Sequence, residues 1–97
     1  MPVLSLGVLA SGRGSNFQSI IDAVDNKTLK AEIVLLITDN PAAFAIERAK
    51  KRGIEYLVIR PKEFSSRDKF YGKISGELQS RGVDLVILAG FMVYRLK

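Results

Sequence analysis

The chain has 97 residues and a formal net charge of +5, and it contains no cysteine, histidine or tryptophan. The lack of cysteine excludes a disulfide framework, a zinc–thiolate site and a thiol nucleophile. The lack of histidine removes the commonest acid–base group and metal ligand at neutral pH, so we expect no metal site. Any chemistry of these residues is therefore limited to carboxylates, lysine, tyrosine, hydroxyls, amides and backbone N–H groups.

The length and the 47% hydrophobic content predict one folded domain. No apolar run reaches the roughly 20 residues of a membrane helix, and the opening Met1–Leu4 lacks the basic region of a signal peptide. We therefore expect a cytoplasmic protein. The basic runs at 50–52, 60–62 and 95–97 are short and separated, so we interpret them as solvated surface and expect no nucleic-acid or membrane partner.

The chain opens on a strand pattern that passes into a helix pattern. A near-continuous apolar run over 3–10 predicts a strand that is covered on both faces. The turn-forming segment 11–16 follows, and a helix is predicted to end at 25–27. Its apolar face consists of Phe17, Ile20, Ile21 and Val24.

A second strand is predicted over 33–37, and the helix after it has signals at both ends. Asn40 suits the N-cap and Pro41 the first helical position. Lys50, Lys51 and Arg52 complement the carboxyl end of the helix dipole, and Gly53 stands where helices commonly end. Mostly small residues form the apolar face of this helix, namely Ala42, Ala45, Ile46 and Ala49.

The last elements repeat the pattern of strand, helix and strand. A short strand is predicted over 56–59, and a final apolar run over 83–89 predicts the fourth strand. Between them, Ser65 or Ser66 can cap a helix that ends at Gly82. The buried face of this helix is predicted to consist of Phe70, Ile74 and Leu78.

The element order is therefore β-α-β-α-β-α-β with short connections, which indicates a parallel sheet. The predicted fold class is α/β, a parallel-sheet, Rossmann-like half-domain that amounts to half of a doubly wound fold. No helix pattern follows the fourth strand, so we expect a further part of the protein or a partner to cover it. An uncovered sheet face or edge favours self-association.

Ligands bind beyond the carboxyl ends of the strands in open α/β sheets. The segments there are 11–16, 38–41 and 90–95. The crossover rules allow the first and fourth strands to be neighbours, and 11–16 and 90–95 would then line one crevice.

Segment 11–16 carries the strongest local signal. Gly12 and Gly14 allow a sharp turn and a close approach to a ligand. The N–H groups of Gly14, Ser15 and Asn16 would point out of a helix N-terminus, which favours a phosphate, with the charge of Arg13 nearby. The alternative is a plain strand-to-helix turn that Ser15 caps.

The other candidates are each open between two interpretations. A dinucleotide site would use Asp39 for a ribose, but Phe17 occupies the place of the third glycine, and Asp39 also suits a turn. Arg67 could pair with a carboxylate or be an exposed first-turn residue. Segment 91–94 could line a ligand slot or pack in a core. Asp84 is not a candidate for the crevice, because it lies at the start of the last strand and therefore at the wrong end of the sheet. No catalytic residue is identified.

Longer stretches of the sequence resemble the phosphoribosylglycinamide formyltransferase family. The stretches that carry the resemblance are Val8–Ala23, Thr38–Ala49, Phe64–Asp68 and Val86–Met92. They occur in order through essentially the whole chain. The Gly-Ser-Asn loop followed much later by Leu-Ala-Gly-Phe-Met is specific for this family.

The resemblance implies an activity and a phosphate site. In this family the amine of glycinamide ribonucleotide attacks the formyl carbon of 10-formyltetrahydrofolate, a step of purine synthesis. An Asn, a His and an Asp stabilise the tetrahedral oxyanion and move protons. Gly14, Ser15 and Asn16 match the loop that holds the substrate phosphate.

The resemblance also implies a folate-binding wall. Arg67 matches a family position that contacts the formyl-folate, and the stretch lining the pterin pocket corresponds to Met92, Val93, Tyr94 and Arg95. The family usually continues Arg-Ile-Leu after Gly-Phe-Met, so side-chain contacts at 93–95 are open while backbone contacts could persist.

The family's catalytic Asn, His and Asp come after residue 97. We therefore expect residues 1–97 to be the N-terminal, substrate-phosphate-binding portion of a formyltransferase domain, without its C-terminal catalytic half and inactive alone. One alternative is a non-catalytic module or truncated paralogue that binds a ribonucleotide phosphate. Another is a nucleotide-cofactor domain that uses Gly12 and Gly14.

Overall fold

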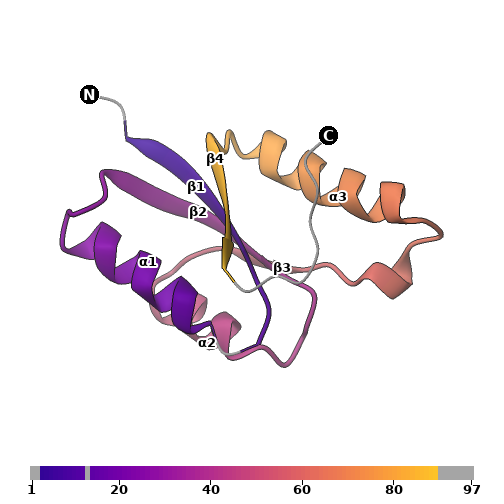
Figure 1. Cartoon of the computed structure of the whole chain (residues 1–97), viewed down its shortest axis with the longest axis horizontal. Coiled ribbons are helices and arrows are strands. Elements are labelled where there is room, and N and C mark those ends of the chain that lie inside the picture. Colours follow the sequence, from indigo (N-terminus) through magenta and orange to yellow (C-terminus); the bar gives the residue numbers. More distant parts are fainter. Residues whose placement is uncertain (1–2, 13, 90–97) are drawn as a thin grey trace.

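The computed structural model describes residues 3–12 and 14–89 and consists of a four-stranded sheet between helices (Figure 1). Each apolar run of the sequence forms a strand, and each amphipathic segment forms a helix. In chain order the elements are β1 (Leu4–Ala10), α1 (Ser15–Asp25), β2 (Ala31–Thr38), α2 (Phe44–Lys51), β3 (Tyr56–Val58), the 3-10 turn η1 (Pro61–Glu63), α3 (Arg67–Ser80) and β4 (Leu85–Ala89).

All strand pairs in the sheet are parallel, and the strand order is β3-β2-β1-β4. The chain therefore moves outward from β1 through β2 to β3 and then returns to the other side of β1. The predicted neighbourhood of the first and fourth strands is confirmed. Their last residues, Ala10 and Ala89, are paired, so the carboxyl ends of both strands lie side by side at a topological switch point.

Helices cover both faces of the sheet, as expected for strands that are apolar on both sides. In Figure 1, α1 and α2 lie on one side of the sheet and α3 on the other. The α1/α2 side buries Val8, Phe17 and Leu36, and the α3 side buries Leu9, Leu35 and Ile74. The parallel sheet and the α/β class follow from this arrangement.

The predicted ends of the helices are largely confirmed. Gly53 and Gly82 follow α2 and α3 with positive φ of 66° and 67°, the conformation that ends helices at glycine. Ser66, one of the two predicted caps, accepts a hydrogen bond of 3.2 Å from the Lys69 N–H at the start of α3. The buried face of α3 includes the predicted Phe70, Ile74 and Leu78.

The predicted start of the second helix is wrong. Asn40 and Pro41 form a turn, and α2 begins at Phe44 with Ala43 as its N-cap. The side-chain Oδ1 of Asn40 accepts a hydrogen bond from the Ala42 N–H, and its carbonyl accepts one from the Ala43 N–H. Because Ala43 then adopts an extended backbone, the helix cannot start before residue 44.

A glycine in β1 lets α3 end close to the sheet. A Cβ at Gly7 would lie 2.4 Å from the Cδ2 atom of Leu78 and 3.3 Å from the nearest methyl of Val83. The pairing register between β1 and β2 shifts at this point, between Leu6 and Gly7. The absence of a side chain therefore brings the end of α3 onto the middle of β1.

No helix in the described part of the chain is long and apolar enough to cross a membrane.

Candidate functional site

The start of α1 is a helix N-terminus without a side-chain cap. Gly14 is the N-cap residue, with φ 76° and ψ 23°, and its carbonyl accepts the first helical hydrogen bond from Gln18 at 2.8 Å. No side-chain oxygen accepts a hydrogen bond there, so the capping by Ser15 that we considered does not occur. Ser15 and Asn16 are exposed. The first N–H groups of a helix have no acceptor within the helix, so they are available to an anion.

The backbone of this loop rests on the start of α2. The Phe44 N–H donates a hydrogen bond of 3.0 Å to the Gly12 carbonyl. Gly14 is buried, and a Cβ there would lie 2.8 Å from both Cα and Cβ of Ala45. The sequence shows that the apolar face of α2 consists mostly of small residues, but it does not indicate which element these residues contact. Only the tertiary structure brings Phe44 and Ala45 to the loop.

Side chains also join α1 to α2 one turn further on. The Arg48 guanidinium donates a hydrogen bond of 3.0 Å to the Gln18 side-chain carbonyl, and the Gln18 amide donates one of 2.9 Å to the Asp22 carboxylate. Arg48 also lies over the Phe44 ring, 4.9 Å from its centre. The first turns of the two helices are thus held in one orientation.

The predicted crevice residues divide between the described and the undescribed parts of the chain. The structure places Gly14, Ser15 and Asn16 at the start of α1, after β1, whose last residue Ala10 is paired with Ala89 of β4. The four predicted folate-binding residues of the last stretch lie outside the described residues, namely Met92, Val93, Tyr94 and Arg95.

Arg67 lies at the same edge of the sheet but on its other face. It is the first residue of α3, it is exposed, and it takes part in none of the ion pairs of the described residues. Of the two interpretations of Arg67, an exposed residue in the first turn of a helix is the one that describes its environment in this structure. An exposed guanidinium is the kind of group that pairs with a carboxylate. No hydrogen bond in the described ranges joins Arg67 to the loop at Gly14.

The remaining sequence candidates take structural positions. Phe17 of α1 is fully buried in the core, at the position where the third glycine of a dinucleotide site would allow the helix to pack closely on the strand. Asp39 follows β2 and is only partly exposed. The Asp84 carboxylate accepts a 2.9 Å hydrogen bond from the Ser5 N–H at the amino edge of the sheet, so it faces away from the crevice as expected.

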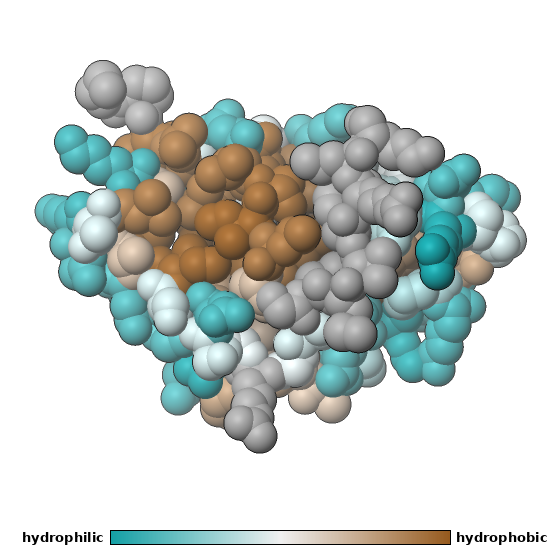
Figure 2. Space-filling model, viewed as in Figure 1, coloured by the Kyte–Doolittle hydropathy of each residue, from teal (hydrophilic) through white to brown (hydrophobic). Residues whose placement is uncertain are grey.

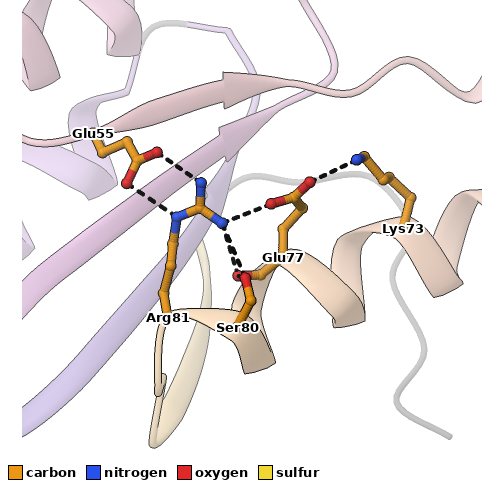
Figure 3. A network of polar contacts seen from close by, with 5 residues as sticks. All are labelled: Glu55, Lys73, Glu77, Ser80 and Arg81. Atoms are coloured by element: carbon orange, nitrogen blue, oxygen red, sulfur yellow. Dashed lines mark hydrogen bonds and ion pairs between the residues drawn. The ribbon is translucent and has the colours of Figure 1, made fainter.

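The strongest electrostatic cluster lies away from this site, at the amino edge (Figure 3). The Arg81 guanidinium contacts both oxygens of Glu55, at 2.6 and 3.0 Å, and Glu77 at 2.6 Å. These bonds hold the pKa of Glu55 below its usual range and raise the pKa of Arg81. The pKa of Glu77 is lowered by Lys73 first and then by Arg81. This cluster fastens α3 to the entry of β3.

Two cavities also lie outside the predicted site. One of about 170 Å³ is near the end of α1, where Asp25 and Arg52 form an ion pair. The other, of about 320 Å³, lies between α2 and β3 and is lined by Phe44 and Tyr56, among others. Among residues 3–12 and 14–89, no three acidic side chains gather where they could hold a metal ion.

The chemistry available at the start of α1 suits an anion. The first turn of α1 carries backbone N–H groups, the Ser15 hydroxyl and the Asn16 amide, and these are donors that suit a phosphate. Glu55, Glu77 and Arg81, whose pKa values are shifted by the bonds described above, lie at the opposite edge of the sheet.

Comparison with known proteins identifies the family. The family model described as formyl transferase matches residues 5–94. A trifunctional purine biosynthetic protein adenosine-3 from Drosophila melanogaster is 40% identical over 89 residues, which are 90% of this chain and 7% of that protein. A phosphoribosylglycinamide formyltransferase from Haemophilus influenzae is 39% identical over 87 residues, or 90% of this chain and 41% of that protein.

Solved structures agree with these relatives. The crystal structure of glycinamide ribonucleotide transformylase 1 from Symbiobacterium toebii superposes with a TM-score of 0.93 and 35% identity, over 98% of this chain and 45% of that one. The chain thus spans less than half the length of these relatives. Because the family match runs through nearly all of its residues, the chain belongs to the formyl transferase family.

Proposed function

We propose that this chain forms the substrate-phosphate site and one folate-facing wall of a phosphoribosylglycinamide formyltransferase. The proposed reaction transfers a formyl group from 10-formyltetrahydrofolate to glycinamide ribonucleotide in purine synthesis. The observation that carries the proposal is the uncapped start of α1 at the switch point between β1 and β4. Relatives with that printed function support it.

The proposed phosphate ligands are Gly14, Ser15 and Asn16. Backbone N–H groups at the start of α1 meet the phosphate along the helix axis, where the dipole favours negative charge. The exposed Ser15 hydroxyl and Asn16 amide add donors that can turn toward the same oxygens. Binding at this point orients the amine at the other end of the substrate.

The proposed folate contacts begin with Arg67. Its exposed guanidinium fits the chemistry of a folate, because the glutamate part of that cosubstrate carries carboxylates. The bound cosubstrate would supply the formyl group. The other proposed contacts are Met92, Val93, Tyr94 and Arg95, which lie outside the described residues.

The phosphate site can be tested by titrating the chain with glycinamide ribonucleotide in a calorimeter. We expect Ser15→Ala and Asn16→Ala each to weaken binding roughly tenfold, about 1.4 kcal/mol, because each removes one donor to a charged group. Ser19→Ala is the matched control, since its hydroxyl lies one turn further along α1 and bonds to the Ser15 carbonyl. Equal affinity of all four proteins would contradict the assignment.

We further propose that these 97 residues alone do not catalyse formyl transfer, since they contain no histidine to move protons. A radiolabelled formyl-transfer assay on the purified chain should show no turnover above background. Phosphate binding without turnover is also the behaviour of a non-catalytic module. Addition of the corresponding carboxyl-terminal half of a relative separates the two, because only an enzyme portion is expected to gain activity.

Self-association through β4 is also proposed. Leu85 and Leu88 of this edge strand are 50% and 51% exposed, and Leu4 on the neighbouring β1 is 44% exposed. Figure 2 shows hydrophobic surface gathered over this part of the sheet. Apolar surface beside an edge strand favours pairing with another copy.

A further inference from the structure

The first turn of α2 lies directly under the proposed phosphate loop, although α2 contributes none of the proposed ligands. We propose that Ala45 is a positioning residue for this loop, acting together with the backbone N–H of Phe44. The inference rests on the proposed function and extends it to a second helix. Its physical basis is the close approach of the Gly14 and Ala45 backbones. Because this approach leaves little space, we infer that the size of the side chain at position 45 controls the position of the loop.

The first observation is the contact between Gly14 and Ala45. A Cβ built on Gly14 would lie 2.8 Å from the Cα and Cβ of Ala45 and 3.2 Å from its nitrogen. These are backbone atoms and the root of a side chain, so they cannot rotate away. Ala45 is also fully buried. We therefore expect a larger residue at position 45 to push against Gly14 and to displace the start of α1.

The second observation is the hydrogen bond of 3.0 Å from the Phe44 N–H to the Gly12 carbonyl. A Cβ at Gly12 would meet no atom within 4 Å, so packing does not hold this glycine on that side. The Phe44 N–H belongs to the first turn of α2 and has no acceptor within its own helix. The bond therefore gives the Phe44 N–H an acceptor. It also fixes the position of Gly12 relative to the start of α2.

The third observation is that no side-chain hydrogen bond caps the start of α1. The N-cap residue, Gly14, has no side chain. A glycine at positive φ is also free to adopt other conformations. The orientation of the phosphate-binding N–H groups is consequently imposed by α2, which leaves all of them available to the ligand.

The test compares three variants of α2 in the full 97-residue chain. Ala45→Val adds two methyl groups against Gly14, whereas Ala45→Gly leaves the close approach intact and weakens only the helix. Ala49→Val is the matched control, because Ala49 is fully buried in the same cluster one turn further on. Affinity for glycinamide ribonucleotide is measured by calorimetry, and thermal stability is measured in parallel.

We expect Ala45→Val to weaken binding by about tenfold or more, since small displacements of positioned groups have large effects. Ala45→Gly and Ala49→Val should lose thermal stability but keep the dissociation constant within about twofold. Wild-type affinity in Ala45→Val, or an equal loss in Ala49→Val, would overturn the proposal. If Ala45→Val does not fold, Ala45→Ser adds a single heavy atom at the same place and should show a smaller loss in the same direction.

A second readout separates this inference from the proposed function. Backbone amide chemical shifts of Gly12, Gly14 and Ser15 are recorded by NMR without ligand. If the wild-type chain binds no glycinamide ribonucleotide, the proposed function fails. Ala45→Val should then still shift these amides, while Ala49→Val should not. Unchanged loop amides in Ala45→Val would refute the positioning role whatever the ligand result.

Discussion

At the scale of single residues, two separate features of Gly14 require a glycine: its backbone conformation and its close contact with Ala45. Its φ of 76° lies in the left-handed region, and its missing Cβ leaves room for Ala45. Gly12 has the first feature only, because its φ is 79° but a Cβ there would be free of contacts. Comparing alanine substitutions at the two positions therefore distinguishes the energetic cost of the backbone conformation from the cost of a steric clash.

We predict that Gly12→Ala lowers the free energy of unfolding by about 1–2 kcal/mol, the cost of a left-handed alanine. Gly14→Ala should lower it by about 2–4 kcal/mol, because overpacking against α2 adds to that cost. Urea unfolding followed by circular dichroism measures both. Equal losses of unfolding free energy in the two variants would contradict this prediction, because the clash with Ala45 would then cost nothing.

At the scale of elements, α3 carries two glycines that its packing does not require. Gly72 and Gly76 are exposed within the helix, and a Cβ at either would meet no atom within 4 Å. Glycine in a helix interior is unfavourable because it loses more backbone freedom than alanine on folding. The helix is held by its Ser66 cap and its buried face rather than by its own propensity.

Replacing these glycines should stabilise the protein. We predict that Gly72→Ala and Gly76→Ala each raise the free energy of unfolding by about 0.5–1 kcal/mol. Gly53→Ala is the control, since its site is equally open but its φ of 66° disfavours alanine. Thermal unfolding should therefore move in opposite directions for the two kinds of site. A loss of stability in Gly72→Ala would mean that α3 packs more closely than the structure indicates.

The ion-pair cluster at Arg81 makes stability depend on pH. Its bonds lower the pKa of Glu55 and of Glu77 in the folded state. A lowered pKa stabilises the fold above the ordinary glutamate pKa of about 4.3, and this contribution is lost as the pH falls through the folded-state pKa. We therefore expect the free energy of unfolding to decrease below that pH.

Urea unfolding at about pH 7 and about pH 3.5 tests this dependence. Glu55→Gln and Glu77→Gln should each show a smaller decrease than the wild-type chain, because each removes one of the carboxylates that must be protonated. Glu32→Gln, an exposed carboxylate outside the cluster, is the control. A wild-type decrease in all three variants would place the acid sensitivity elsewhere.

At the scale of the whole molecule, β4 is an edge strand of the described sheet and carries exposed leucines. We predict that the wild-type chain associates with increasing concentration in analytical ultracentrifugation, and that Leu88→Lys shifts it to a monomer by adding charge to the edge. Phe44→Lys is the charge-matched control, because Phe44 is 52% exposed but lies on α2. A wild-type chain that stays monomeric at all concentrations would contradict self-association.

The sequence by itself determined the order of elements, because each strand and helix carries its own apolar period. The β-α-β-α-β-α-β pattern, the buried Phe70, Ile74 and Leu78, and the glycines that end α2 and α3 were all predictable from local chemistry. The phosphate site at Gly14, Ser15 and Asn16 stays a prediction, made because a Gly-rich turn between a strand and a helix suits an anion. The folate wall at 92–95 stays a prediction.

Only the tertiary structure decided which elements share the site. The start of α2 was predicted wrongly because Asn40 can cap either a helix or a turn, and a distant bond from Phe44 to Gly12 accompanies the second choice. The contact of Ala45 with Gly14 spans residues that no local period relates. Local patterns reflect forces within a few residues of chain, whereas the loop is held by packing between helices that β2 separates.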